Sequence, residues 1–144
     1  MIAVDTNILV FAHRKDSPFH AAAVRHVVGL AEGRTPWAIP WPCLQEFLGV
    51  VTHPRIYVPP TPLSSALGQV DAWLDSPALV LLSESEQYWV VLRELLSTSQ
   101  VAGARIHDAR IAALCIQHQV SELWSADRDF SRFPKLRVVN PLNR

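Results

Sequence analysis

The chain has few lysines, few cysteines and no excess of charge of either sign. Of its 144 residues, 13 are basic and 13 are acidic, so the formal net charge is zero. A chain with no net charge has no long-range attraction to nucleic acid, so any binding of a phosphate backbone must depend on local groups of basic residues. Lysine occurs only at Lys15 and Lys135. The other basic residues are arginines, whose planar guanidinium suits forked contacts to phosphate.

The scarcity of cysteine excludes several kinds of site. Cys43 and Cys115 stand far apart, and no Cys-x-x-Cys pair indicates structural zinc or a redox couple. Each cysteine lies inside an apolar helical pattern. The sequence therefore predicts two reduced cysteines in the core.

Long apolar runs are also missing. None reaches the length of a membrane span, and the first residues lack the basic segment and long apolar segment of a signal peptide. We therefore expect a cytoplasmic protein without a membrane partner. With 49% hydrophobic residues, no repeat and no low-complexity tail, the sequence predicts a single domain over residues 1–144.

What is present is an alternation of short apolar runs and helical patterns. Strands are predicted at residues 2–4, 37–39, 78–82, 122–125 and 137–139. Helices are predicted at residues 17–33, 42–53, 61–74, 83–97 and 108–117. Strands separated by helices are typical of βαβ units. The sequence thus predicts an α/β fold of three layers, α/β/α, around a mostly parallel central sheet.

Local signals set the predicted helix boundaries. Ser17 and Pro18 are typical of an N-cap and a first helical turn. The Ser-Glu-Ser-Glu run at 83–86 reads as a capping box for the helix that follows. Three prolines within residues 57–62 exclude regular structure from that connector.

Two acidic residues follow predicted strands. Asp5 comes directly after the strand at 2–4, and Asp127 comes just after the strand at 122–125. A parallel sheet brings both to the edge at which open α/β sheets bind ligands. An Asp in this position is, however, more often the N-cap of the next helix. Both interpretations remain open for Asp5 taken alone.

Two further acids lie within predicted helices. Asp108 shares a stripe with apolar residues at i+3, i+4 and i+7, and Glu46 shares one with apolar residues at i−3 and i+4. These spacings aim both carboxylates towards the protein rather than towards water. Four converging carboxylates repel one another unless they are protonated or neutralised by a cation. All-oxygen ligation favours Mg²⁺ or Mn²⁺ over structural zinc, and such an ion permits phosphodiester hydrolysis in nucleic acid.

Polar neighbours of these acids are candidate supporting residues. Thr6, Asn7 and Ser125 would orient Asp5 and Asp127, or they would only cap local structure. Asp127 and Asp129 are both candidates for the fourth acid. We prefer Asp127 because it lies closer to the strand end, and we expect Asp129 to cap the following turn.

Arginines, tryptophans and one histidine near the predicted site have less certain roles. The arginines would hold an RNA backbone or would pair with the same acids; they are Arg14, Arg105, Arg110, Arg128 and Arg132. The five tryptophans are expected mostly in the core or at interfaces, although a base-stacking platform is the alternative. His107, at a helix start, is expected to be a cap or an exposed residue.

Four motifs occur in a characteristic order. They are Asp5–Asn7 after the opening strand, Gln45–Phe47 in an early helix, His107–Leu114, and Ser125–Phe130. Together they resemble the PIN domain, and within it the VapC toxin ribonucleases of bacterial toxin–antitoxin pairs. The resemblance spans nearly the whole chain. Where family members often have Thr, this chain has Ser125, which keeps the hydroxyl group.

The resemblance carries expectations about fold, activity and partners. It implies a parallel sheet between helices, endoribonuclease activity that depends on Mg²⁺ or Mn²⁺, a homodimer, and inhibition by a small cognate antitoxin of the VapB type. The acidic quartet of the family would fall on Asp5, Glu46, Asp108 and Asp127.

Two other functional classes are alternatives for a sequence with these acids. A receiver-like Mg²⁺-binding module would require an Asp at the end of a middle strand, but the strand at 78–82 ends in Ser83. A non-catalytic module that acts by protein interaction on the same fold is the other alternative. The presence of all four acids argues against it.

Overall fold

The computed structural model describes residues 1–143 and contains one five-stranded sheet. Its strands are β1 (Ile2–Val4), β2 (Trp37–Pro40), β3 (Leu79–Leu82), β4 (Glu122–Trp124) and β5 (Val138–Val139). The strand order is β3-β2-β1-β4-β5, and every neighbouring pair is parallel. The predicted parallel α/β sheet is confirmed.

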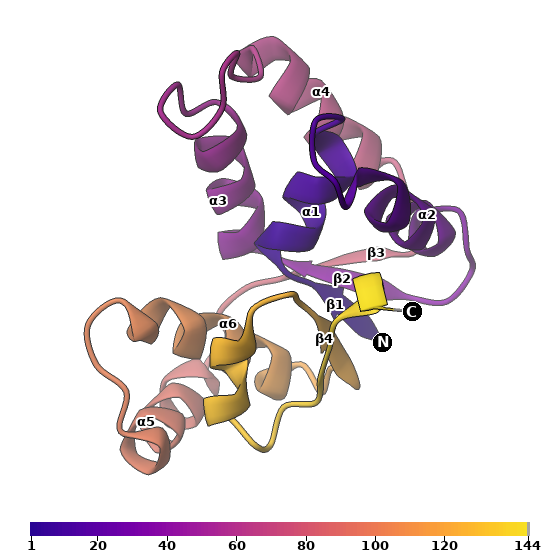
Figure 1. Cartoon of the computed structure of the whole chain (residues 1–144). Coiled ribbons are helices and arrows are strands. Elements are labelled where there is room, and N and C mark those ends of the chain that lie inside the picture. Colours follow the sequence, from indigo (N-terminus) through magenta and orange to yellow (C-terminus); the bar gives the residue numbers. More distant parts are fainter. Residues whose placement is uncertain (144) are drawn as a thin grey trace.

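Helices cover both faces of this sheet (Figure 1). On one side are α1 (Thr6–His13), α2 (His20–Ala31), α3 (Trp41–Val51) and α4 (Leu63–Leu74). On the other side are α5 (Tyr88–Ser99) and α6 (Arg105–Gln117), with the 3-10 helix η1 (Arg128–Arg132) packed against α6. A second 3-10 helix, η2 (Pro141–Asn143), contacts α2. The arrangement has the three layers expected from the sequence.

The core lies between the sheet and the two helical layers. Trp37, Phe47, Leu114 and Leu123 are among its largest fully buried side chains. Both cysteines are buried and free, as predicted. Among the tryptophans, Trp37, Trp73 and Trp124 are buried, whereas Trp41 and Trp89 are exposed. No helix within residues 1–143 is both long enough and apolar enough to cross a membrane.

The order of the strands places a crevice at the centre of the molecule. From β1 the chain builds β2 and β3 on one side, and β4 and β5 are added on the other side. Strand order therefore reverses between β1 and β4, where open α/β folds bind ligands. The two strands are in register, and the backbone N–H of Asp5 donates to the carbonyl of Trp124 at 2.9 Å. Asp5 and Asp127 thus leave adjacent strands at the same edge.

Three predicted helix starts are wrong. Residues 17–19 form a turn in which the Ser17 hydroxyl accepts from the N–H of Phe19, so α2 begins only at His20. Residues 83–86 do not form a capping box; the Ser85 hydroxyl accepts from the N–H of Gln87, and α5 begins after this turn. The last helix begins at Arg105 without a side-chain cap, so Asp108 lies inside its first turn. The connector at 57–62 has no helix or strand, as predicted.

Candidate active site

Asp5 lies at the bottom of the crevice, and both of its carboxylate oxygens accept hydrogen bonds. Oδ1 accepts from the backbone N–H of Thr6 at 2.8 Å and from the Cys43 thiol at 3.5 Å. Oδ2 accepts from the Ser125 hydroxyl at 2.7 Å and from the Asn7 amide at 3.4 Å. Asp5 is also the N-cap of α1, so the two interpretations of this residue hold together. These donors come from α1, α3 and the segment that follows β4, and they fix the carboxylate in place.

The pKa of Asp5 reflects a balance between burial and these donors. Only 5% of the residue is exposed. Burial raises the pKa of its carboxyl from 3.8 to about 6, while the hydrogen bonds from Ser125 and Thr6 act in the opposite direction. The nearby charge of Glu46 raises the pKa further. Asp5 is therefore a carboxylate that the fold holds at an electrostatic cost.

Asn7 and Ser125 link the two strand ends. The Asn7 side chain donates to the Ser125 hydroxyl at 3.3 Å and accepts from the N–H of Ala126 at 3.2 Å. The Ser125 hydroxyl in turn accepts from the N–H of Asp127 at 3.0 Å. Thr6 serves a third acid, because its hydroxyl donates to Glu46 at 3.3 Å. All three polar neighbours predicted as supporting residues thus contact the acids or the backbone that carries them.

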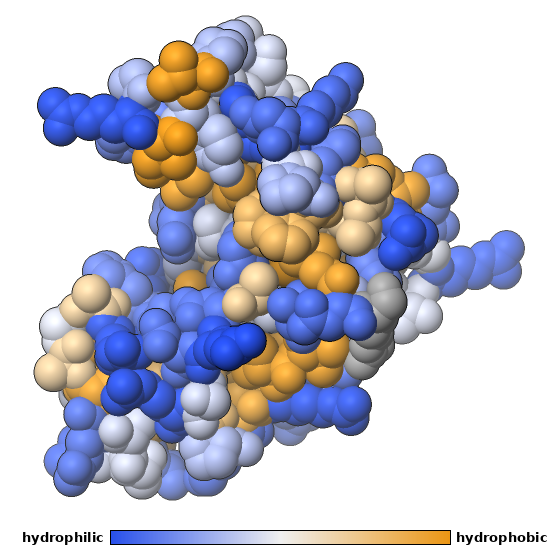
Figure 2. Space-filling model, viewed as in Figure 1, coloured by the Kyte–Doolittle hydropathy of each residue, from blue (hydrophilic) through white to orange (hydrophobic). Residues whose placement is uncertain are grey.

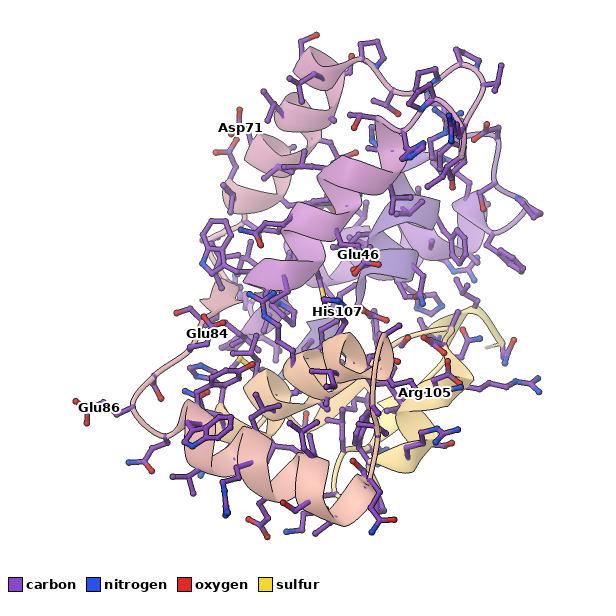
Figure 3. All side chains as sticks on the ribbon, turned by 90° about the vertical axis from the view of Figure 1, so that its left-hand side faces the viewer. Glu46, Asp71, Glu84, Glu86, Arg105 and His107 are labelled. Carbon is purple, nitrogen blue, oxygen red and sulfur yellow. The ribbon has the colours of Figure 1, made fainter. Side chains whose placement is uncertain are left out.

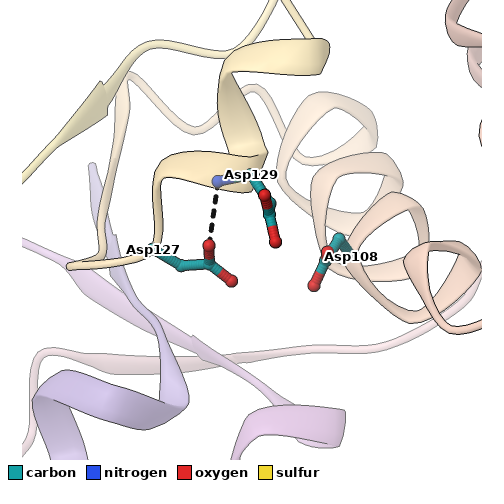
Figure 4. Close-up of side chains that lie close together, drawn as sticks. All are labelled: Asp108, Asp127 and Asp129. Atoms are coloured by element: carbon teal, nitrogen blue, oxygen red, sulfur yellow. Dashed lines mark hydrogen bonds between the residues drawn. The ribbon is translucent and has the colours of Figure 1, made fainter.

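A second group of acids lies on the open side of the crevice (Figure 4). Asp108 comes from α6, and Asp127 and Asp129 come from the start of η1. One carboxylate oxygen from each lies within 4.8 Å of the other two, and all three residues are partly exposed. Burial, followed by the charges of Asp127 and Asp129, raises the pKa of the Asp108 carboxyl. We call these three residues the open triad.

The roles expected for Asp127 and Asp129 need correction. The 3-10 helix is capped by Asp127, whose Oδ1 accepts from the N–H of Asp129 at 2.8 Å. Asp129 is not the cap; its carboxylate turns towards Asp108 and pairs with Arg105 at 2.8 Å. Sequence position alone could not separate the two, because the turn decides which carboxylate bonds to the backbone. Phe130 is buried and anchors the turn, as expected.

The four acids predicted to act together all line one cleft. Its volume is about 250 Å³, and its polar wall contains Asp5, Glu46, Asp108 and Asp127. The cleft lies in the hollow between the upper and lower helical layers in Figure 2. Figure 3 looks into this hollow, with Glu46 above and Arg105 and His107 below. Glu46 itself is exposed, so the expectation that its helical stripe would turn it away from water is wrong.

A neighbouring cleft continues past the acids. It has a volume of about 470 Å³ and shares Glu46, Asp108 and Ile111 with the first cleft. Its other walls include His107 and Arg110, and His107 is exposed as expected. Glu46 and Asp108 therefore stand at the boundary of two connected hollows.

The arginines near the site differ in what they contact. Arg105 pairs with Asp129 of the open triad. Arg14 and Arg110 pair with acids outside it, Asp16 and Glu84. The remaining two are exposed on η1 and do not line the acid cleft: Arg128 and Arg132. Only Arg105 thus follows the expectation of pairing with the site's own acids.

The donor set suits a hard divalent cation. The open triad offers three carboxylates that make few competing contacts, and Glu46 and Asp5 lie in the same cleft. Carboxylate oxygens are the ligands that Mg²⁺ and Mn²⁺ prefer, and no thiol or imidazole belongs to the cluster. Cys43 faces Asp5, but its pKa is raised well above 9.0 by burial, so its thiol stays protonated and donates.

Comparison with known proteins places this arrangement in a family. Residues 2–136 match the family described as PIN domain. Ribonuclease VapC43 of Mycobacterium tuberculosis is 38% identical over 143 residues, which cover 99% of this chain and 97% of that protein. Ribonuclease VapC48 of the same organism is 30% identical, with 96% of each chain covered.

Solved structures share the fold. FitAcB from Neisseria gonorrhoeae aligns over the full length of both chains with a TM-score of 0.69 and 18% identity. VapBC2 from Rickettsia felis, solved with a DNA fragment from its promoter, aligns with a TM-score of 0.68 and 23% identity over 96% of this chain and 98% of that one. From its sequence, its parallel sheet and its acid-lined crevice, this chain belongs to the PIN domain family and, within it, to the VapC ribonucleases.

Proposed function

We propose that the protein is an endoribonuclease that depends on Mg²⁺ or Mn²⁺ and acts as the toxin of a toxin–antitoxin pair. One observation carries the proposal. Four carboxylates from four separate segments, Asp5, Glu46, Asp108 and Asp127, line a single cleft. Carboxylates this close repel one another, and a bound cation would neutralise that repulsion. The ribonuclease names of the relatives support RNA as the substrate.

The open triad and Glu46 would hold the cation. When bound, it would neutralise charge on the phosphate and lower the pKa of a water molecule for attack on phosphorus. The residues of the chain itself hold these carboxylates in position. Asp5 is fixed by hydrogen bonds from Ser125 and Thr6, and Thr6 also holds Glu46. A preorganised carboxylate set does not have to reorganise during the reaction.

Cleavage within an RNA chain, rather than at its end, is supported by the position of two neighbouring clefts. The two clefts meet at Glu46 and Asp108, so a strand can continue on both sides of the acids. Arg110 and His107 line the second cleft and are placed to contact a phosphate backbone there. Arg128 lies on η1, beyond the acids, and remains a candidate for the same role.

A VapB-type antitoxin is the proposed partner, with a homodimer as the proposed state of the toxin. This is supported by VapBC2, which was solved bound to a DNA fragment from its promoter, and by a toxin–antitoxin complex from Klebsiella pneumoniae that shares the fold. The chain offers exposed apolar side chains for such contacts on and before α4, namely Ile56, Val58, Leu63 and Leu67. We further propose that residues 1–144 form one PIN domain that acts in the cytoplasm.

RNA cleavage with and without divalent cations tests the proposed activity. The purified protein should cleave RNA in Mg²⁺ or Mn²⁺ and stop in chelator. Asp108→Asn should lower the rate by on the order of a hundredfold or more, because a metal ion supplies several kcal/mol of transition-state stabilisation. Asp71→Asn is the matched control, since Asp71 is an exposed acid on α4, away from the hollow (Figure 3).

The outcomes separate an enzyme from a binding module. Cleavage that survives Asp108→Asn at the wild-type rate would point to a contaminating nuclease. Binding of Mn²⁺ and RNA without cleavage would favour the non-catalytic alternative. Loss of cleavage in Asp108→Asn but not in Asp71→Asn supports the proposed function.

A further inference from the structure

The acid cleft has a second wall that is apolar and aromatic. Val10, Phe11, Val50 and Tyr57 line the cleft together with the carboxylates. Phe11 packs on Phe19 with ring centroids 5.1 Å apart and an interplanar angle of 47°. Cation chemistry at the acids has no use for such a wall. It therefore needs a different explanation, one that concerns the rest of the substrate.

Tyr57 is held firmly although it lies in a connector without regular structure. The Arg14 guanidinium lies over the Tyr57 ring, 4.2 Å from its centroid. Arg14 is itself anchored by two contacts to Asp16, at 2.9 and 2.6 Å, and by the carbonyl of Pro59 at 3.0 Å. A cation over an aromatic face stabilises the stack, and its anchors limit the motion of the ring.

The same contacts exclude Arg14 as a direct phosphate ligand. Its side chain is only 11% exposed, and the Thr61 hydroxyl accepts a further hydrogen bond from it at 3.2 Å. A guanidinium with these partners has no free fork for a phosphate. Arg14, which the sequence suggested as an RNA contact, is thus occupied by contacts within the chain, one of which places it over the Tyr57 ring.

We propose that Phe11 and Tyr57 form a subsite that binds one nucleobase next to the scissile phosphate, with Arg14 holding the Tyr57 ring in place. This inference rests on the proposed function, because the acids of the same cleft define where the phosphate lies. Bases have flat apolar faces, and they stack on aromatic side chains with little dependence on sequence. The subsite therefore positions the strand and discriminates mainly against a missing base.

The size of the cleft favours a base over a peptide. Pockets for drug-sized ligands enclose roughly 300–1,000 Å³, and this cleft encloses about 250 Å³. That space suits one flat ring system beside the acids. The acidic wall also repels acidic segments and, with a cation present, attracts phosphate.

Removal of the ring and removal of the base should have the same effect. Tyr57→Ala should lower kcat/KM for a short RNA by roughly 5- to 100-fold, the range for loss of one base–aromatic stack. Tyr57→Phe should remain near wild type. An RNA with an abasic sugar beside the mapped cleavage site should be cut more slowly by wild type by the same factor. On that abasic RNA, Tyr57→Ala should cleave at the same rate as wild type, because the base that stacks on the ring is already missing.

Two further variants test the arrangement. Arg14→Gln should slow cleavage in the wild-type background but add no further loss to Tyr57→Ala, because it acts through the ring. Trp89→Ala is the control for removal of an exposed aromatic outside the cleft, and it should cleave at the wild-type rate. Equal losses for Tyr57→Ala on intact and abasic RNA would overturn the proposal.

A binding measurement separates failure of the subsite from failure of the proposed function. An RNA that carries 2-aminopurine, which loses fluorescence when it stacks, is titrated with protein in Ca²⁺. Quenching by wild type and Tyr57→Phe but not by Tyr57→Ala supports the subsite, even if no cleavage is seen in Mn²⁺. Normal cleavage by Tyr57→Ala, combined with loss of inhibition by an antitoxin, would assign the wall to a protein side chain and overturn the proposal.

Discussion

The two sides of the acid cleft are built differently. On the buried side, Asp5 is 5% exposed and receives hydrogen bonds from Thr6, Cys43 and Ser125. On the open side, the carboxylates of Asp108, Asp127 and Asp129 face one another with Arg105 as the neighbouring cation. Hydrogen bonds within the fold fix the carboxylate on the buried side. On the open side, the three carboxylates depend mainly on a nearby cation that neutralises their charge.

Because of this difference, we expect the two sides to contribute differently to the stability of the fold and to cation binding. A buried carboxylate that loses a donor is left unsatisfied, and the fold bears the cost. Partly exposed carboxylates are solvated in the free protein and gain a common partner when a cation arrives. The buried side should therefore control folding, and the open side should control the response to metal.

The largest expected effect is stabilisation by Mn²⁺ and its loss on the open side. A ligand that binds only the folded protein stabilises it by about 2.7 kcal/mol at a hundredfold excess over Kd. Wild type should gain this amount, measured by thermal or denaturant unfolding with Mn²⁺ and with chelator. Asp108→Asn should respond much less. In chelator it should be at least as stable as wild type, because burial, followed by the charges of Asp127 and Asp129, raises the pKa of the Asp108 carboxyl and so disfavours its charged form.

Asp71→Asn provides the comparison for that measurement, since it removes an exposed charge outside the cleft. It should keep the full response to Mn²⁺. If Asp108→Asn is less stable in chelator and still gains as much as wild type from Mn²⁺, then Asp108 is a structural residue and the open side is assigned incorrectly.

A smaller effect is expected from Ser125→Ala on the buried side. The Ser125 hydroxyl donates to Asp5 and accepts from the N–H of Asp127, and the residue is 2% exposed. Loss of a partner of a buried polar group costs about 1–3 kcal/mol, measured by denaturant unfolding. Ser97→Ala removes a hydroxyl that bonds to an exposed helix carbonyl and should cost under about 0.5 kcal/mol. Equal costs for the two variants would contradict the comparison.

A third effect, of about 1 kcal/mol, is expected from pH in the presence of chelator. Burial raises the pKa of the Asp5 carboxyl from its ordinary value of 3.8 to about 6 in the folded protein. The folded state therefore holds this proton more tightly, so its stabilising effect is complete below pH 3.8 and is lost as pH rises through 6. Going from pH 7 to pH 5 should thus stabilise the protein by about 1 kcal/mol through Asp5.

The measurement is the slope of unfolding free energy against pH. Asp5→Asn should remove this part of the slope, whatever its own stability at one pH. Glu86→Gln, at an exposed acid outside the site, should keep it. A slope that is the same in wild type and Asp5→Asn would show that the Asp5 carboxyl is not perturbed by burial.

The sequence predicted the parts of the site that depend on regular structure. Strand ends in a parallel sheet meet at one edge, which was sufficient to bring Asp5 and Asp127 together. Helical periodicity placed Asp108 on a stripe with buried residues. Family motifs supplied the rest of the quartet. The placement of Asp5, Asp127 and Asp108 was correct because the period of a strand or helix fixes side-chain direction, whereas the same reasoning failed for Glu46, which is exposed.

Other features depend on contacts that sequence patterns do not encode. No side chain caps α6, so its start at Arg105 left no signal. The division of roles between Asp127 and Asp129 depends on the geometry of a 3-10 turn and on Arg105. Tyr57 lies in a connector, lines the cleft and has the Arg14 guanidinium over its ring. Each of these features depends on contacts between residues far apart in sequence or on the geometry of irregular backbone, and neither leaves a periodic pattern in the sequence.

The smallest expected change in stability comes from Arg105→Gln, and it separates the two sides most directly. Arg105 and Asp129 form a surface pair with side chains 38% and 49% exposed, and such pairs contribute little to folding. The melting temperature in chelator should therefore stay close to that of wild type. The affinity for Mn²⁺ should increase severalfold, because Asp129 no longer has a competing cation beside it. Isothermal titration with Mn²⁺ measures this change.

Arg110→Gln is the matched control for this last variant. Its pair with Glu84 has almost the same exposure, 40% and 46%, but Glu84 does not belong to the open triad. Both variants remove one positive charge from the surface of the lower layer. Mn²⁺ affinity should therefore increase in Arg105→Gln and remain unchanged in Arg110→Gln. An equal increase in both would mean that general surface charge, and not the Arg105–Asp129 contact, limits cation binding on the open side.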